Sequence, residues 1–384
     1  MNHILDIHRD CCRPVYSNSF SLCTSFATMF LTRAVIRPVS RFTRRSAVMS
    51  YKPTLLGFVA RSLIASHSHA TFSTKTAVDP VTAHPTPMMP DMFCRQCEQT
   101  ADHFACTTVG ICGKTSETAA CQDTLIHMIK SVSTWADQAR ISGVTDLNEA
   151  NVWTLSATFS TLTNVNFSDE RIAEYITQGQ VIQKDLVKKL AAAGGTPPSE
   201  DIASLDLTGM SVTQLEDFGH TVSIPVRQTA MDHVDAFSLN EMATYGLKGA
   251  CAYAMHCHQL GVMDQAVMKN VHSIFRKLAS SEPDMDGLLK TVLLVGETSG
   301  QVLKNLDEAH CSNLGAPEPS QVRMTVTAGK CILVSGHDMM DLYELLKQTQ
   351  GKGINVYTHG EMQPAHAYPK LKEFDHLVGN YGTA

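Results

Sequence analysis

Four cysteines lie within nineteen residues of this 384-residue chain, and they constrain what it can fold into more than any other feature. A long chain with bunched cysteines favours metal ligation over disulfides, because disulfide scaffolds are usually short and cysteine-dense throughout. The first two cysteines can place two sulfurs at one site from a single turn, and the later two can close it. The sequence therefore predicts a thiolate metal site of spacing C-x2-C-x8-C-x5-C, formed by Cys94, Cys97, Cys106 and Cys112.

The spacing of these cysteines also bears on the kind of metal. Thiolates are soft ligands that suit both zinc and iron–sulfur clusters. Zinc sites often contain two C-x2-C pairs, whereas this segment contains one. The irregular gaps of eight and five residues suit a chain that wraps around a larger cubane cluster. From the residues alone we favour an iron–sulfur cluster, with a zinc site and unrelated thiols as the alternatives.

The first 91 residues differ in composition from the rest of the chain. They carry ten lysines and arginines against four acidic residues, and no acidic residue occurs between Asp10 and Asp79. A segment rich in arginine and serine and poor in acids is typical of an organellar transit peptide. Four prolines in residues 79–91 indicate an extended linker. We predict a targeting leader for the mitochondrion or the plastid; the alternative is a disordered basic tail on a cytoplasmic protein.

The remaining residues form an acidic body, with 21 lysines and arginines against 33 acidic residues. Because binding to phosphate groups requires a basic face, this balance argues against a nucleic-acid partner. No stretch approaches the length of about eighteen uncharged apolar residues that a membrane span needs. We therefore expect neither nucleic acid nor a membrane among the partners.

Apolar residues at spacings of three and four predict helices through most of residues 115–310. The predicted helices cover residues 116–140, 147–159, 168–193, 240–260, 263–279 and 285–309. Residues 196–226 contain three prolines and are predicted to be a connection, and residues 313–320 a second linker. Short turns between antiparallel helices suggest bundles. We predict a helical domain of two helix bundles that, with the cysteine segment, spans residues 92–320.

Near the C-terminal end, the spacing of apolar residues changes from one typical of helices to one that includes strands. Residues 330–336 and 354–358 read as buried strands, and residues 338–350 between them as a helix. Strand, helix and strand with short connections form a parallel βαβ unit. Residues 369–374 are predicted to be a further helix, and 376–379 the start of a third strand. Since such domains usually contain more strands, residues 321–384 are predicted to be the first part of a Rossmann-like parallel α/β domain. The fold class is thus α + α/β.

Two polar residues follow these strands directly. His337 comes after the first strand and Glu361 after the second. The carboxyl ends of parallel strands meet at one edge of a sheet, where open α/β sheets place their ligand sites. A histidine and a carboxylate that converge there can bind a transition metal; the alternative is a helix N-terminus with polar neighbours. His359 and His366 are expected to be supporting or solvent-exposed groups.

Other cysteines and histidines give weaker signals. The run from Cys251 to His258 invites a metal-site interpretation, but adjacent positions of a helix point apart, so a packed helix is favoured. Cys121, Cys311 and Cys331 are scattered along the chain. Buried free cysteines behave as small apolar side chains, and we predict that role for these three.

Several segments together closely resemble one protein family. They are MFCRQCEQT, GICGK, LVSGHDMMDLYELLKQTQGKGINVYTHGEMQPAHAYPKLK and HLVGNYGTA. They resemble the hybrid-cluster protein family, also called the prismane protein or hydroxylamine reductase family. The resemblance runs from Met92 to Ala384, and it implies an N-terminal helical domain of two bundles followed by two α/β domains.

The resemblance also implies two metal clusters. It assigns a [4Fe-4S] cubane to the four cysteines of the segment. It makes His337 and Glu361 the first two ligands of a hybrid [4Fe-2O-2S] cluster. The family's remaining ligands of that cluster lie downstream, so the resemblance implies an incomplete ligand set and a C-terminally truncated chain.

The function that the resemblance implies is that of a redox enzyme. Electrons from an unidentified donor protein enter at the cubane and reach the hybrid cluster. There a small nitrogen-oxide substrate is reduced, either hydroxylamine to ammonia and water or nitric oxide, in nitrogen metabolism or nitrosative stress. The truncated chain itself is expected to be inactive. The alternatives are a non-catalytic [4Fe-4S] electron-transfer or redox-sensing protein, a carbon monoxide dehydrogenase-like enzyme and a zinc-stabilised structural module.

Overall fold

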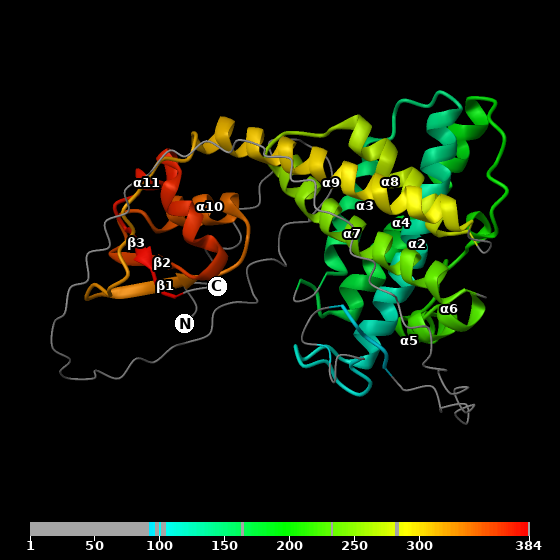
Figure 1. The fold of residues 1–384 in the computed structure, drawn as a ribbon, viewed down its shortest axis with the longest axis horizontal. Helices are drawn as coiled ribbons and strands as arrows, with labels where there is room; N and C mark the ends of the chain where they lie inside the picture. The colour runs from blue at the N-terminus through cyan, green and yellow to red at the C-terminus, as the bar shows by residue number, and fades with distance from the viewer. Residues whose placement is uncertain are drawn as a thin grey trace, which may run out of the picture. The chain divides into compact units, whose positions relative to one another are not determined.

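The computed structural model describes residues 92–96, 100, 105–162, 165–231, 233–280 and 284–382 (Figure 1). The predicted targeting leader, residues 1–91, lies outside the described residues. The described chain begins with the cysteine segment, continues through a helical region and ends in a small parallel sheet. The helical region contains α2 (Ser116–Ile141), α3 (Asn148–Ser160), α4 (Asp169–Ala192), η2 (Asp201–Ser204), α5 (Val212–Thr221), α6 (Ile224–Ala230), α7 (Val234–Gln259), α8 (Gln265–Leu278) and α9 (Met285–Leu314).

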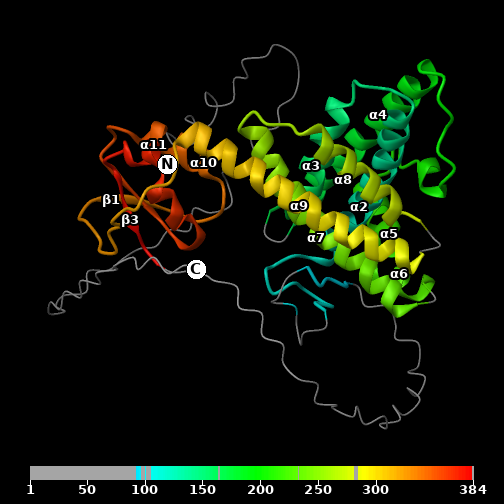
Figure 2. The ribbon, with the colours of Figure 1, turned by 45° about the horizontal axis from the view of Figure 1, so that its top comes forward.

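Helix α2 is the centre of the helical region and is buried almost all around. It packs against α4, α5 and α8, and α7 and α9 run side by side (Figures 1 and 2). The Thr115 side chain accepts a hydrogen bond from the Thr118 amide and caps α2, and Ser168 caps α4 in the same way. These caps satisfy amide groups that have no partner inside the helix, which fixes where each helix begins. The predicted start of α4 at residue 168 is confirmed to within one residue.

One prediction for the helical region is wrong. Residues 196–226 were expected to be a connection, but they contain η2, α5 and the start of α6. Ser211 and Gln214 form a capping box at the start of α5, and Pro225 occupies the first turn of α6, where a missing amide proton has no cost. Helix α7 also begins six residues before the predicted start, and α9 continues to Leu314. The division of these helices into two bundles stays a prediction.

Helix α5 lies very close to α2 at Gly219. A Cβ atom at this position would lie 2.0 Å from the carbonyl oxygen of Ala120 and 2.9 Å from Thr124 Oγ1. The Thr124 hydroxyl donates a hydrogen bond of 2.6 Å to the carbonyl of Leu215, one turn earlier in α5. The two backbones can approach this closely only because residue 219 has no side chain.

A buried histidine joins α8 to the helices around it. His272 is fully buried, with Nε2 3.0 Å from Asn151 Oδ1 and Nδ1 3.3 Å from Ser133 Oγ. Burial lowers the pKa of His272 to about 3, because a charged imidazole would lose its hydration there. The imidazole is therefore neutral in the folded protein over a wide range of pH.

This histidine predicts a loss of stability in mild acid. Below pH 6.5 the unfolded chain takes up a proton at residue 272, whereas the folded chain does not until about pH 3. The free energy of unfolding should therefore fall by up to about 1.4 kcal/mol per pH unit across this window. Urea unfolding of the full chain at pH 7, 6 and 5 measures the slope. His272→Gln should reduce this slope by its own share, up to about 1.4 kcal/mol per pH unit, and the exposed His233→Gln should not; equal slopes in the two variants would contradict the assignment.

The C-terminal region is a three-stranded parallel sheet of order β1-β2-β3. It contains β1 (Lys330–Val334), α10 (Met339–Thr349), β2 (Ile354–Thr358), η3 (Gly360–Ala367), α11 (Pro369–Lys372) and β3 (Leu377–Asn380). Leu342 and Leu346 of α10 pack with Val356 and Leu371 in a common apolar core. The predicted parallel βαβ unit is confirmed, and so is the α + α/β class in its broad form.

Strand β1 corrects another prediction. It was expected to be buried, but it is the edge strand of the described sheet, and Lys330 and Cys331 are exposed. Cys311 is only half-buried, so the predicted apolar role is confirmed for Cys121 alone among the three scattered cysteines. In the described part of the chain, no helix has both the length and the apolarity needed to cross a membrane.

Candidate metal site

The cysteine segment is held together by its own backbone. Cys94 and Cys106 form an isolated antiparallel bridge, with N···O distances of 3.0 Å and 2.8 Å. Met92 and Cys106 are buried, and with Cys94 they pack against Ala119 in the first turn of α2. Residues directly opposite each other in such a bridge direct their side chains to the same face. The bridge therefore places two of the four predicted ligands side by side at the start of α2.

A tight turn positions the third described cysteine. The Gly110 amide donates to the Lys114 carbonyl, and the Gly113 amide donates to the Gly110 carbonyl, each at 2.8 Å. Gly113 has a φ of +89°, which favours glycine. A Cβ atom at Gly110 would lie 3.2 Å from Cys112 Sγ and 3.1 Å from Lys114 Cβ. The small residue at position 110 thus leaves room for the Cys112 sulfur and the Lys114 side chain.

Lys114 is a functional candidate that sequence reasoning missed. Its side chain is only 1% exposed, although lysine is rarely buried without a partner. Its ammonium donates a 2.7 Å hydrogen bond to Gln122 Oε1 and lies 3.8 Å from Cys94 Sγ. Burial raises the pKa of the Cys94 thiol, and the nearby Lys114 charge opposes that rise. Since metal binding needs the thiolate, the ammonium favours the form of Cys94 that binds metal.

The donor atoms of this segment fit an iron–sulfur cluster. Cys97 lies outside the described residues, so the structure shows three of the four predicted thiols. Among the described residues, no group of three or more His, Cys, Asp or Glu side chains is placed to hold a single metal ion. In a cubane each thiolate binds a different iron atom, so its ligands stand further apart than those of one ion. Soft thiols next to a buried cation suit such a cluster, which is anionic.

The structure brings His337 and Glu361 together, as the strand pattern predicts. His337 follows β1, Glu361 lies in η3 after β2, and His337 Nε2 contacts Glu361 Oε2. Both side chains are more than half exposed, at 62% and 61%. The pair presents an imidazole nitrogen and a carboxylate oxygen to solvent at the carboxyl edge of the sheet. Metal ligation by the two residues stays a prediction.

The two neighbouring histidines differ in their surroundings. His366 is buried, and its Nε2 lies 2.8 Å from the hydroxyl of Thr358, the last residue of β2. Burial lowers the pKa of His366. His359 is half-buried, with Nδ1 3.3 Å from Ser335 Oγ. Both histidines therefore contact the ends of the strands beside the His337–Glu361 pair.

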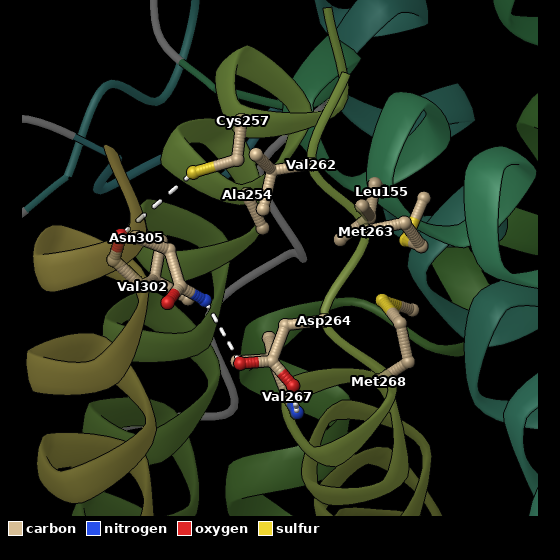
Figure 3. A pocket seen from close by; sticks show the side chains of 10 residues that line it. All are labelled: Leu155, Ala254, Cys257, Val262, Met263, Asp264, Val267, Met268, Val302 and Asn305. Carbon is tan, nitrogen blue, oxygen red and sulfur yellow. Dashed lines mark hydrogen bonds between the residues drawn. The ribbon is translucent and has the colours of Figure 1, made fainter. Parts of the chain in front are cut away.

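The Cys251–His258 run belongs to α7, and Cys251 and Cys257 are both buried among apolar side chains. The prediction of a packed helix is confirmed for these two cysteines. A small cavity between α3, α7, α8 and α9 borders Cys257 (Figure 3). Its volume is about 10 Å³, room for about one water molecule, so it is too small for a substrate. Asn305 donates a 2.9 Å hydrogen bond to Asp264 at its edge.

Comparison with known proteins gives consistent matches. The sequence profile of the prismane/CO dehydrogenase family matches residues 92–384. A hydroxylamine reductase from Actinobacillus succinogenes is 40% identical over 297 residues, covering 76% of this chain and 53% of the relative. A hydroxylamine reductase from Escherichia coli is 41% identical over 297 residues, and the match covers 54% of that relative. The chain thus spans about half the length of the curated relatives it matches.

A solved structure of carbon monoxide dehydrogenase IV from Carboxydothermus hydrogenoformans also matches. The match covers 77% of this chain and 44% of that chain, at 14% identity. Its TM-score is 0.20, which is too low to support a conclusion about the fold.

Proposed function

Because this chain belongs to the prismane/CO dehydrogenase family, we propose that it is an iron–sulfur oxidoreductase that reduces hydroxylamine. The reaction is NH2OH + 2 e⁻ + 2 H⁺ → NH3 + H2O. The observation that carries the proposal is the meeting of His337 and Glu361 at the carboxyl edge of the sheet. About 40% identity to hydroxylamine reductases favours this substrate over others in the family.

The proposal assigns a role to each predicted site residue. The four cysteines hold a [4Fe-4S] cluster; they are Cys94, Cys97, Cys106 and Cys112. When bound, this cluster supplies one electron at a time, and the bridge between Cys94 and Cys106 holds two of its ligands in place. His337 and Glu361 contribute a nitrogen and an oxygen ligand to the hybrid [4Fe-2O-2S] cluster. Their exposure leaves the edge open to the small nitrogen-oxide substrate and to protons from solvent.

The organisation of the chain follows the same proposal. Residues 92–320 form the cysteine segment and a helical domain of two bundles, which receives electrons from a donor protein. Residues 321–384 belong to a Rossmann-like α/β domain that carries the substrate site. Residues 1–91 form a leader that directs the protein to a mitochondrion or plastid.

A second candidate function is a non-catalytic [4Fe-4S] electron-transfer or redox-sensing protein. The observation that favours it is the contrast between the two sites. The cysteine segment offers soft thiolates and a buried ammonium, whereas the sheet edge offers two exposed side chains.

The full chain, reconstituted anaerobically with iron and sulfide, tests the two candidates. Turnover, measured as hydroxylamine-dependent oxidation of reduced methyl viologen, would support the reductase; it would then disappear in His337→Ala and persist in the exposed control His233→Ala. A cubane spectrum without turnover would instead favour the electron-transfer protein. Metal analysis separates the remaining alternatives, since nickel would indicate a carbon monoxide dehydrogenase-like enzyme and zinc a structural module.

A further inference from the structure

The surroundings of Cys94 contain an unusual number of buried charges. A buried charge cluster, defined here by six side chains, lies where the cysteine segment meets α2, α6 and α7. Its members are the buried Lys114, Lys130, Glu241 and Lys248 and the half-buried Asp123 and Arg227. The three lysines are 1%, 6% and 3% exposed in the order given. Lysine at this depth requires a compensating anion, because removing an ammonium from water is costly.

The carboxylates of this cluster do not balance its cations. Arg227 forms an ion pair with Glu241, which leaves Asp123 against three lysines. Burial and, to a lesser extent, the charge of Arg227 together lower the pKa of Lys130 to about 7. Burial lowers the pKa of Lys248 as well. Within the described residues, this cluster therefore carries more positive than negative side chains when they are all ionised, and an anion placed beside it would stabilise the lysines in their charged form.

Lys114 is the member of the cluster nearest to a predicted metal ligand. Its ammonium lies 3.8 Å from Cys94 Sγ. Gln122 holds the ammonium through a 2.7 Å hydrogen bond, and the amide nitrogen of Gln122 donates at 3.3 Å to the carbonyl of Asn166. Gln122 is itself buried. Because its side-chain amide is hydrogen-bonded through both its oxygen and its nitrogen, it holds the Lys114 ammonium in one position. Among the described residues, no carboxylate lies within 4.0 Å of the Lys114 ammonium.

We propose that Lys114, positioned by Gln122, is the counter-cation of the metal–thiolate centre and raises its reduction potential. This inference rests on the proposed [4Fe-4S] cluster at the four cysteines. An oxidised cubane with four thiolates carries a charge of −2, and its reduction by one electron gives −3. A fixed cation beside a ligand sulfur stabilises the −3 state more than the −2 state, and burial weakens the screening of that interaction. A hydrogen bond to the sulfur acts in the same direction.

The potential distinguishes this role from a purely structural one. A lysine that only fills space beside α2 would affect folding and iron content, but not the potential of an assembled cluster. Lys114→Met keeps the length of the side chain and removes the charge. Gln122→Glu leaves the lysine in place and neutralises it with a carboxylate. Lys130→Met is the matched control, because Lys130 is a buried lysine of the same cluster without a contact to Cys94.

The experiment is a redox titration of the full chain, reconstituted anaerobically and followed by electron paramagnetic resonance, with iron and sulfide measured on each sample. Lys114→Met and Gln122→Glu should both shift the midpoint potential to more negative values. Lys114→Arg, which keeps the charge, and Lys130→Met should stay close to the wild-type value.

The outcomes separate this inference from the proposed function. A cubane with wild-type potential in both Lys114→Met and Gln122→Glu would overturn the role of Lys114 and leave the cluster assignment intact. If Lys114→Met fails to assemble a cluster, the potential of Gln122→Glu decides. A wild-type chain that binds no iron and sulfide would overturn the cluster assignment, and this inference with it.

Discussion

Cys94→Ala is expected to abolish the visible absorption of the cubane in the full chain reconstituted anaerobically. The iron content should fall by about four atoms per chain, because a cubane needs all four thiolates to hold its iron atoms. Cys94 lies opposite Cys106 in the backbone bridge and beside the Lys114 ammonium, so its loss removes the best-supported ligand of the site. Cys97→Ser, at the ligand outside the described residues, should have the same effect.

The matched control for this result is Cys331→Ala. Cys331 is exposed in β1, so its replacement removes one thiol without creating a cavity. The control should keep the wild-type iron and sulfide content and the wild-type spectrum. The visible absorption of the cluster, together with iron and sulfide analysis, measures the outcome. An unchanged iron content in Cys94→Ala would refute the assignment of the cubane to this segment.

Gly219→Ala is expected to destabilise the helical region by about 3 kcal/mol, because the new methyl group overpacks the contact between α5 and α2. Its Cβ atom would lie 2.0 Å from the Ala120 carbonyl oxygen and 2.5 Å from the carbonyl carbon. These are backbone atoms in the middle of an interface, so no side-chain rotation can relieve the clash. The helices must separate, and the 2.6 Å hydrogen bond from Thr124 to Leu215 would weaken.

A glycine in α7 provides the control for this second prediction. A Cβ atom at Gly249 would meet no atom within 4 Å. Gly249→Ala should therefore leave the free energy of unfolding unchanged or raise it by about 0.5–1 kcal/mol, since alanine restricts the unfolded chain. Urea unfolding of both variants, followed by circular dichroism, compares them directly. Equal stabilities would show that α5 and α2 do not depend on the small residue.

The secondary structure was largely predictable where local signals were strong. A serine such as Ser168 marks the start of a helix because its side chain bonds a free backbone amide. From residue 330 onward, short apolar runs bounded by glycines mark the strands and the turns between them. The prediction failed between residues 196 and 226 because three prolines outweighed a capping box. Ser211 and Gln214 are the S-x-x-Q signal that would have found α5.

The candidate site was predictable in part, for a different reason. His337 and Glu361 are found from sequence because parallel strands place their carboxyl ends together. Lys114 and Lys248 could not be found this way, since the sequence does not show that α7 brings residue 248 close to the cysteine segment. Long-range packing decides which charges share a low-dielectric environment. Lysine also looks like an ordinary solvent-exposed residue until its burial is known.

The bridge between Cys94 and Cys106 has a consequence for how a metal centre is built on this chain. Two hydrogen bonds join the ends of a loop of eleven intervening residues. Loop closure costs conformational entropy, and these backbone hydrogen bonds offset part of that cost. The bridge holds two of the predicted ligands as neighbours, and the third lies on the turn that follows. Part of the entropic cost of bringing the ligands to one site is therefore met by backbone hydrogen bonds, and the thiolates need not meet all of it.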